Sequence, residues 1–172
     1  PILWGKIAEF CRNHRIFLPS LDGVFVAGAP VSREVLRQIE NVAINAEAAT
    51  PYGATEALPV TYVSSKEIFS SPEAAAKTGE QGTLVGKAVA GVEVRIIKLA
   101  DAALDAGEME ELPLRHVGEV IVRGPNVSRE YLRREEETRQ AKIIDGKSFW
   151  HRMGDMGYLD ERGNLYFCGR KT

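Results

Sequence analysis

The stretch that decides the fold is HRMGDMGYLDERGNLYFCGR, residues 151–170. Apolar and aromatic residues flank a turn-rich connection at Asp160–Asn164, which predicts a β-hairpin. Folding back at this turn would bring Asp155, before the hairpin, close to Arg170, after it. A carboxylate beside a guanidinium suits a ribose diol, because charged groups make the stronger hydrogen bonds to hydroxyls. The alternatives are that Asp155 caps the turn at 154–157 and that Arg170 forms a surface ion pair.

Size and composition are those of a soluble globular protein with one domain or two small lobes. Of the 172 residues, 44% are hydrophobic and 27% are charged. The 22 Lys and Arg residues and 24 Asp and Glu residues give a formal net charge of −2, which argues against a dominant nucleic-acid surface. Cys11 and Cys168 have no metal-binding or redox spacing, so we expect reduced thiols and a cytoplasmic location. We expect no transmembrane segment, since no apolar run is long enough.

The first 60 residues alternate helical and strand patterns. Apolar residues at helical spacing predict an amphipathic helix over 3–14. Residues 24–27 and 42–45 predict buried strands. Between them, Ser32 is a suitable N-cap for a helix that carries Glu34 in its first turn. This strand–helix–strand order predicts part of a parallel α/β sheet.

The pattern changes after about residue 60. Residues 91–97 and 118–124 alternate apolar and polar side chains, as half-buried strands do, and the acidic stretch 101–111 between them predicts a solvated loop. We therefore expect an α/β subdomain over 1–70 and a mostly antiparallel β subdomain over 71–172.

One further helix is predicted in the second part. Ser128 can cap a charged helix that runs to about Gln140, with Tyr131 and Leu132 as its inward contacts. The Arg and Glu residues at 133–137 would form its solvated face.

The sequence TPYGATE, residues 50–56, follows a predicted strand at the place where ligands bind in parallel α/β sheets. Tyr52 offers an aromatic face to a base, and Gly53 lets the backbone come close. Thr55 supplies a hydroxyl for a phosphate, and Glu56 is an oxygen ligand that could hold Mg²⁺. The alternative is a turn with a capping Thr-Glu pair, in which Tyr52 is a core residue.

Five short motifs, in order along the chain, resemble those of the adenylate-forming superfamily. This superfamily contains acyl-CoA synthetases, luciferases and the adenylation domains of peptide synthetases. The motifs are VAGAP at 26–30, YGATE at 52–56, GEVIVRGP at 118–125, RMGD at 152–155 and GR at 169–170. One such match would carry little weight, but five in the family's order and approximate spacing argue against coincidence.

The resemblance implies a binding site for ATP and AMP. Adenine would lie between a backbone turn formed by Gly28, Ala29 and Pro30 and the ring of Tyr52, with Gly53 beside it. A plain helix-entry turn is the alternative for Gly28, Ala29 and Pro30. The resemblance makes Asp155 the acceptor for the ribose hydroxyls and Arg170 a donor to ribose or phosphate.

The resemblance also implies an ATP-dependent ligase that joins a carboxylate to AMP and expels pyrophosphate. Thr55 and Glu56 would be its catalytic residues, with Thr55 on a phosphate and Glu56 on Mg²⁺. The family's phosphate-binding loop and the lysine of its C-terminal domain have no counterpart in this sequence. We therefore expect the second part of the large N-terminal domain of a longer enzyme, inactive without its N-terminal half and C-terminal domain. It would comprise a partial parallel α/β sheet and a small distorted β-barrel-like lobe, ending at the inter-domain hinge, where Thr172 replaces the usual Asp or Lys.

Within the superfamily, the chain is most similar to the β-lactone synthetase and fatty-acyl ligase branch of olefin biosynthesis. PYGATEALPV at 51–60, Met153 and FCGRK at 167–171 carry this similarity, and a peptide-synthase-like relative fits them nearly as well. The implied substrate is a long-chain fatty or β-hydroxy fatty acid, and the acceptor is CoA, a carrier protein or an internal hydroxyl. A non-catalytic nucleotide-binding or scaffolding member of the fold, and an unrelated β-rich interaction domain, are the other hypotheses.

Overall fold

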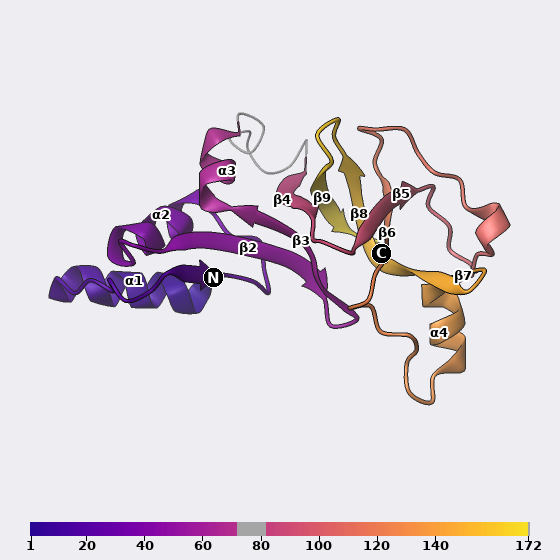
Figure 1. Cartoon of the computed structure of the whole chain (residues 1–172), viewed down its shortest axis with the longest axis horizontal. Helices are drawn as coiled ribbons and strands as arrows, with labels where there is room; N and C mark the ends of the chain where they lie inside the picture. The colour runs from indigo at the N-terminus through magenta and orange to yellow at the C-terminus, as the bar shows by residue number, and fades with distance from the viewer. Residues whose placement is uncertain (72–81, 172) are drawn as a thin grey trace.

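The computed structural model describes residues 1–71 and 82–171, in which nine strands form one sheet (Figure 1). The strand order is β1-β2-β3-β4-β9-β8-β6-β5, and β7 pairs with β8 off this path. β1 (Gly23–Phe25) and β2 (Glu47–Ala54) are parallel, whereas the other described pairs are antiparallel. The predicted α/β part followed by a mostly antiparallel β part is confirmed. The path has two ends, so no barrel-like closure is seen among the described strands.

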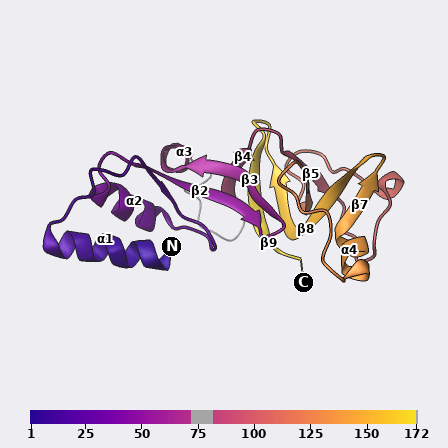
Figure 2. The ribbon, with the colours of Figure 1, turned by 60° about the horizontal axis from the view of Figure 1, so that its bottom comes forward.

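Helices α1 (Ile2–His14) and α2 (Arg33–Val42) lie at one end of the molecule, and α4 (Glu135–Ala141) lies at the other (Figures 1 and 2). The predicted cap of α2 is confirmed, since the Ser32 hydroxyl accepts a hydrogen bond from the Val35 N–H at 3.3 Å. Within the described residues, no helix is long and apolar enough to cross a membrane.

The strand predicted at residues 42–45 is wrong. Val42 ends α2, and the strand β2 begins only at Glu47. Val42 and Ala43 are buried as the last apolar contacts of the helix, and a short apolar run does not distinguish a helix end from a strand. The shift moves the 50–56 motif out of a loop and into β2 and its turn to β3 (Ala57–Ser64).

The second half of the chain is built mainly from strands. The strands predicted around 91–97 and 118–124 are confirmed, and the acidic stretch between them carries one 3₁₀ turn, η2. The remaining elements are α3 (Ser65–Ser70), β4 (Thr83–Ala88), β5 (Glu93–Ile97), η2 (Ala106–Glu108), β6 (Gly118–Arg123), β7 (Lys142–Asp145), β8 (Ser148–Leu159) and β9 (Asn164–Arg170).

The helix predicted from Ser128 starts seven residues later, at Glu135. The backbone of Ser128 is engaged elsewhere: its N–H donates to the Glu56 carbonyl at 2.7 Å, and its carbonyl accepts from Lys142 Nζ at 2.5 Å. Leu132 is 84% exposed and is not an inward contact, whereas Tyr131 does point inward.

The hairpin predicted at the end of the chain is confirmed. β8 and β9 pair with Tyr158 opposite Tyr166 and with Asp155 opposite Arg170. The side chain of Asp160 closes the connection, because its Oδ1 accepts the backbone N–H groups of Arg162 and Asn164. The division of the chain at residues 70 and 71 stays a prediction, since it falls beside residues 72–81, which lie outside the described part, as does Thr172.

Gly86, on the central strand β4, allows a test of how closely the strands pack there. It lies at an irregularity of β4 with φ of 91°, and a Cβ there would stand 2.0 Å from the carbonyl oxygen of Tyr62. Gly86→Ala should lower the free energy of unfolding by about 2 kcal/mol or more in urea titrations, because both the conformation and the space exclude a side chain. Gly107→Ala, where a Cβ meets nothing within 4 Å, should change it by less than about 1 kcal/mol. Equal losses would contradict this account.

Candidate functional site

A pocket of about 300 Å³ brings together the residues predicted to contact a nucleotide. It is called the first pocket below. Gly28, Ala29 and Pro30 reach it from the turn after β1, and the backbone at Gly28 has φ of 89°, which favours glycine. Its remaining predicted members are Tyr52 and Gly53 on β2, Asp155 on β8 and Arg170 on β9. Segments more than 100 residues apart in sequence thus share one concave surface.

The carboxylate of Asp155 joins the strands around this pocket. One oxygen accepts the Tyr52 hydroxyl at 2.6 Å, and the other accepts Arg170 Nη1 at 2.8 Å. Asp155 is buried, whereas the Arg170 side chain is 67% exposed. The juxtaposition predicted from the hairpin is therefore confirmed, although Asp155 lies within β8 and not in a turn before it.

β8 contains a bulge next to Asp155. β6 and β8 pair at Ile121 with Arg152 and at Glu119 with Met156, so β8 has two extra residues between these pairs. Gly154 lies within the bulge with φ of 65°. Bulges turn side chains away from the regular alternation of a strand. Arg152 and Asp155 line different pockets, as expected for residues an odd number apart on a strand.

The Tyr52 hydroxyl keeps its proton and donates a hydrogen bond to this carboxylate. Burial raises the pKa of the Tyr52 phenol far above its usual value, and the hydrogen bond and charge of Asp155 raise it further. The ring of Tyr52 lies 6.1 Å from the ring of Phe167, tilted by 44°. Its hydroxyl and its ring are thus both held at the pocket wall.

Gly53 is required by the β2–β3 hairpin itself. A Cβ at this position would lie 2.3 Å from the carbonyl oxygen of Ala57 and 2.9 Å from Leu58 Cδ1. The register of the two strands shifts between Tyr52 and Ala54. The missing side chain therefore makes room for β3, a constraint separate from any approach of a ligand.

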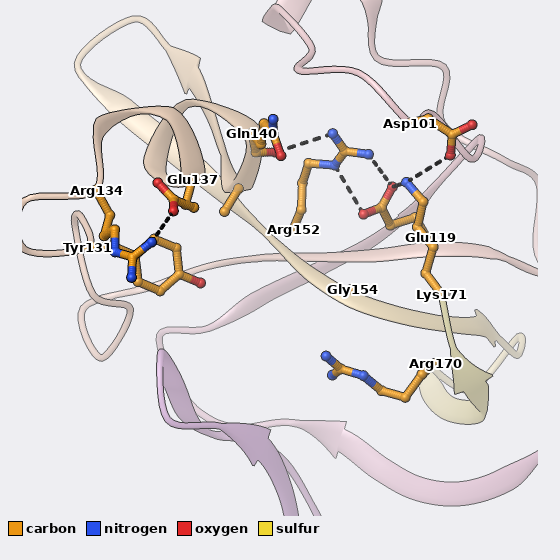
Figure 3. Close-up of a pocket in the computed structure, with 11 residues that line it drawn as sticks. Asp101, Glu119, Tyr131, Arg134, Glu137, Gln140, Arg152, Gly154, Arg170 and Lys171 are labelled. Carbon is orange, nitrogen blue, oxygen red and sulfur yellow. Dashed lines mark hydrogen bonds and ion pairs between the residues drawn. The ribbon is translucent and has the colours of Figure 1, made fainter.

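Thr55 and Glu56 lie outside the lining of the first pocket, in the turn between β2 and β3. Thr55 is exposed, and Glu56 Oε1 accepts the hydroxyl of Tyr131 at 2.9 Å. Tyr131 lines a second pocket of about 620 Å³ (Figure 3), and Arg170 lines both pockets. Arg170 therefore lies between the two pockets.

Arg152 and Glu119, which line the second pocket, form a buried ion pair. Two bonds join them, at 3.0 and 2.7 Å, and both side chains are buried. Lys171 Nζ lies 3.4 Å from the same carboxylate (Figure 3). Arg152 also donates to the carbonyls of Ala102 and Gln140, which ties the loop before η2 and the end of α4 to β8. The sequence did not lead us to predict this pair as part of the site. The glutamate beside the apolar residues of β6 could have indicated it, because a buried glutamate needs a partner.

A hydrogen bond helps to keep the Glu56 carboxylate ionised. Burial acts to raise its pKa, but the Tyr131 hydrogen bond, a hydrogen bond from its own backbone and the charge of Lys142 outweigh burial and lower the pKa. Burial lowers the pKa of Lys142 to about 8, against the opposing effect of Glu56. Among the described residues, no group of three or more His, Cys, Asp or Glu could hold a metal. A single carboxylate is still compatible with Mg²⁺, which often takes its other ligands from phosphates and water.

Comparisons with known proteins identify the family. The model of the AMP-binding enzyme family matches residues 3–132, so the chain belongs to this family, and the resemblance to adenylate-forming enzymes is confirmed. The olefin beta-lactone synthetases of Stenotrophomonas maltophilia and Xanthomonas campestris are 44% and 42% identical to it over 100% of this chain and 31% of their own length. The chain thus spans about a third of the length of these relatives.

A solved structure shares the fold. The long-chain-fatty-acid-CoA ligase of Archaeoglobus fulgidus superimposes with a TM-score of 0.75 at 24% identity, covering 100% of this chain and 33% of the ligase.

His151 predicts a specific pH dependence of stability. Burial, and then the charge of Lys142, lower its pKa from 6.5 to about 4. Between these two values the unfolded chain binds a proton at His151 and the folded protein does not, so the contribution of His151 to stability is lost as pH falls from about 6.5 to about 4 and does not change below that. The loss assigned to this one group is about 3 kcal/mol.

The measurement is urea unfolding of the wild type and of His151→Gln between pH 7 and pH 4. The variant should lose less stability than the wild type across this range, whatever its stability at pH 7. His116→Gln, at an exposed histidine, should follow the wild-type profile. Parallel profiles for the wild type and His151→Gln would show that folding does not lower the pKa of His151.

Proposed function

We propose that this chain supplies the nucleotide-binding wall of an ATP-dependent ligase that activates a carboxylic acid as an acyl-adenylate and releases pyrophosphate. The observation that carries the proposal is the convergence on one pocket of the seven residues assigned to adenine and ribose, namely Gly28, Ala29, Pro30, Tyr52, Gly53, Asp155 and Arg170. Membership of the AMP-binding enzyme family supports it independently of that geometry.

The first pocket would hold the nucleoside. Adenine would pack between the turn at residues 28–30 and the ring of Tyr52, with Gly53 beside it. The ribose hydroxyls would donate to Asp155, which as a charged acceptor can serve both. Arg170 would leave its exposed position and contact ribose or phosphate oxygen, since its side chain is free to move on the solvent side.

The phosphates would then extend past Arg170 towards the turn of β2 and β3. Thr55 would contribute its hydroxyl, and Glu56 would bind Mg²⁺. When bound, Mg²⁺ neutralises charge on phosphate oxygens. The protein's own part is positioning: catalysis of this kind depends on holding the carboxylate and phosphate in line and on fixed charges around them.

The proposed substrate is a long-chain fatty acid or β-hydroxy fatty acid. Support comes from the similarity to two olefin beta-lactone synthetases along the whole of this chain. CoA, a carrier protein or the hydroxyl of the substrate would accept the acyl group. The acid site would be completed by the N-terminal half and the C-terminal domain of the full-length protein, and residues 1–172 alone should be inactive.

Pyrophosphate release tests this function. The full-length protein is given ATP, Mg²⁺ and a panel of acids of increasing chain length, with and without a β-hydroxyl. Release that depends on a long-chain acid supports the proposal. Tight binding of AMP or of a non-hydrolysable acyl-adenylate mimic, with no pyrophosphate release for any acid, would instead identify a non-catalytic nucleotide-binding member.

Asp155→Asn tests the ribose contact in the full-length protein. The variant keeps one neutral acceptor oxygen, so AMP binding should weaken by about 2 kcal/mol or more, the difference between two hydrogen bonds to a charged group and those to a neutral one. Isothermal calorimetry with AMP and with 2′,3′-dideoxy-AMP gives the readout: the wild type should prefer AMP strongly, and the variant should lose that preference. Asp145→Asn removes a carboxylate that pairs with Arg123 and should leave the preference intact. A variant that still distinguishes the two nucleotides as the wild type does would refute the assignment.

A further inference from the structure

The segment 126–131, between β6 and α4, runs along the turn that carries Glu56. Val127 forms a bridge with Ala57, and the Ser128 N–H donates to the Glu56 carbonyl at 2.7 Å. Asn126 Nδ2 donates to the carbonyl of Pro59 at 2.6 Å. These contacts hold the segment against the β2–β3 turn. Glu56 in that turn is 75 residues away from Tyr131 in sequence.

The same segment brings one side chain onto the Glu56 carboxylate. The Tyr131 hydroxyl donates to Oε1 at 2.9 Å, and the backbone N–H of Tyr131 donates to Thr138 Oγ1 at 2.9 Å. Tyr131 is therefore held from α4 while it holds Glu56. Lys142 supports the arrangement, since its Nζ donates to the Ser128 carbonyl and lies 5.9 Å from the centre of the Tyr131 ring.

A glutamate in an exposed turn would otherwise sample several rotamers. Fixing it costs conformational entropy that a metal would have to offset on binding. A hydroxyl that donates to one carboxylate oxygen removes part of this cost in advance and leaves the second oxygen for a cation. Partners of this kind commonly change metal affinity by about 10-fold or more when they are removed.

We infer that Tyr131 is a positioning residue for Glu56: its hydroxyl orients the carboxylate so that Oε2 is presented to the metal of the metal–nucleotide complex. The inference rests on the proposed function, and it adds a residue from the β6–α4 connection to a site otherwise built from β2, β8, β9 and the turns that follow β1 and β2. Tyr131 acts through Glu56 and not on the nucleotide.

Tyr131→Phe in the full-length protein tests the inference, because it removes the hydroxyl and keeps the ring beside Lys142. Two affinities are measured: Mn²⁺ in the presence of ATP, by electron paramagnetic resonance, and AMP without metal, by calorimetry. The variant should bind Mn²⁺ about tenfold more weakly, and its affinity for metal-free AMP should change less than twofold. Tyr62→Phe, at a partly exposed tyrosine of β3 outside both pocket linings, is the matched control and should change neither.

Glu56→Gln and the double variant decide how Tyr131 acts. If Tyr131 works through Glu56, the double variant should bind Mn²⁺ no more weakly than Glu56→Gln alone. Additive losses, unchanged Mn²⁺ binding in Tyr131→Phe, or an equal fall in AMP and Mn²⁺ affinity would each overturn the inference. Unchanged Mn²⁺ binding in Glu56→Gln would also overturn it while leaving the nucleotide site standing. A wild type that binds neither AMP nor ATP would overturn the proposed function itself, and the inference with it.

Discussion

The carboxylate of Asp155 is the point on which the candidate site depends. It is buried, and it accepts hydrogen bonds from Tyr52 on β2 and Arg170 on β9. A buried charge without partners would be strongly destabilising, so these contacts are needed whether or not a ligand is present. Tyr52 supplies a donor that stays protonated, and Arg170 supplies a compensating charge that reaches in from solvent. Two contacts from different strands thus hold the carboxylate in place, one with a buried neutral donor and one with a cation that is mostly exposed.

The strand that carries Asp155 is irregular beside it. β8 has two additional residues between its pairings with Glu119 and Ile121, and Gly154 among them has a positive φ. Residues an odd number apart on a strand face opposite sides, and Arg152 and Asp155 keep this relation. Asp155 lines the first pocket, while Arg152 lies against Glu119 under the second.

Local patterns predicted much of this structure, and long-range contacts account for the rest. The α2 cap, the alternating strands and the closing hairpin follow from neighbouring residues, and their prediction was confirmed. The end of α2 and the start of β2 were misplaced because an apolar run fits either element. The start of α4 was misplaced because Ser128 contacts the Glu56 turn, a pairing that spacing alone does not reveal. The bulge at Gly154 and the contact of Tyr131 with Glu56 were missed for the same reason.

The second pocket is less cationic than its residues suggest. Arg152 and Lys171 share the carboxylate of Glu119, and Arg134 pairs with Glu137 at 2.7 Å (Figure 3). A buried ion pair adds little net stability, because desolvation offsets its attraction. Its geometry is nevertheless specific: two bonds from Arg152 fix β8 against β6 beside the bulge. Arg170, which is mostly exposed and lines both pockets, is likewise paired, with Asp155 on the neighbouring strand, so each of these cations already has a carboxylate partner.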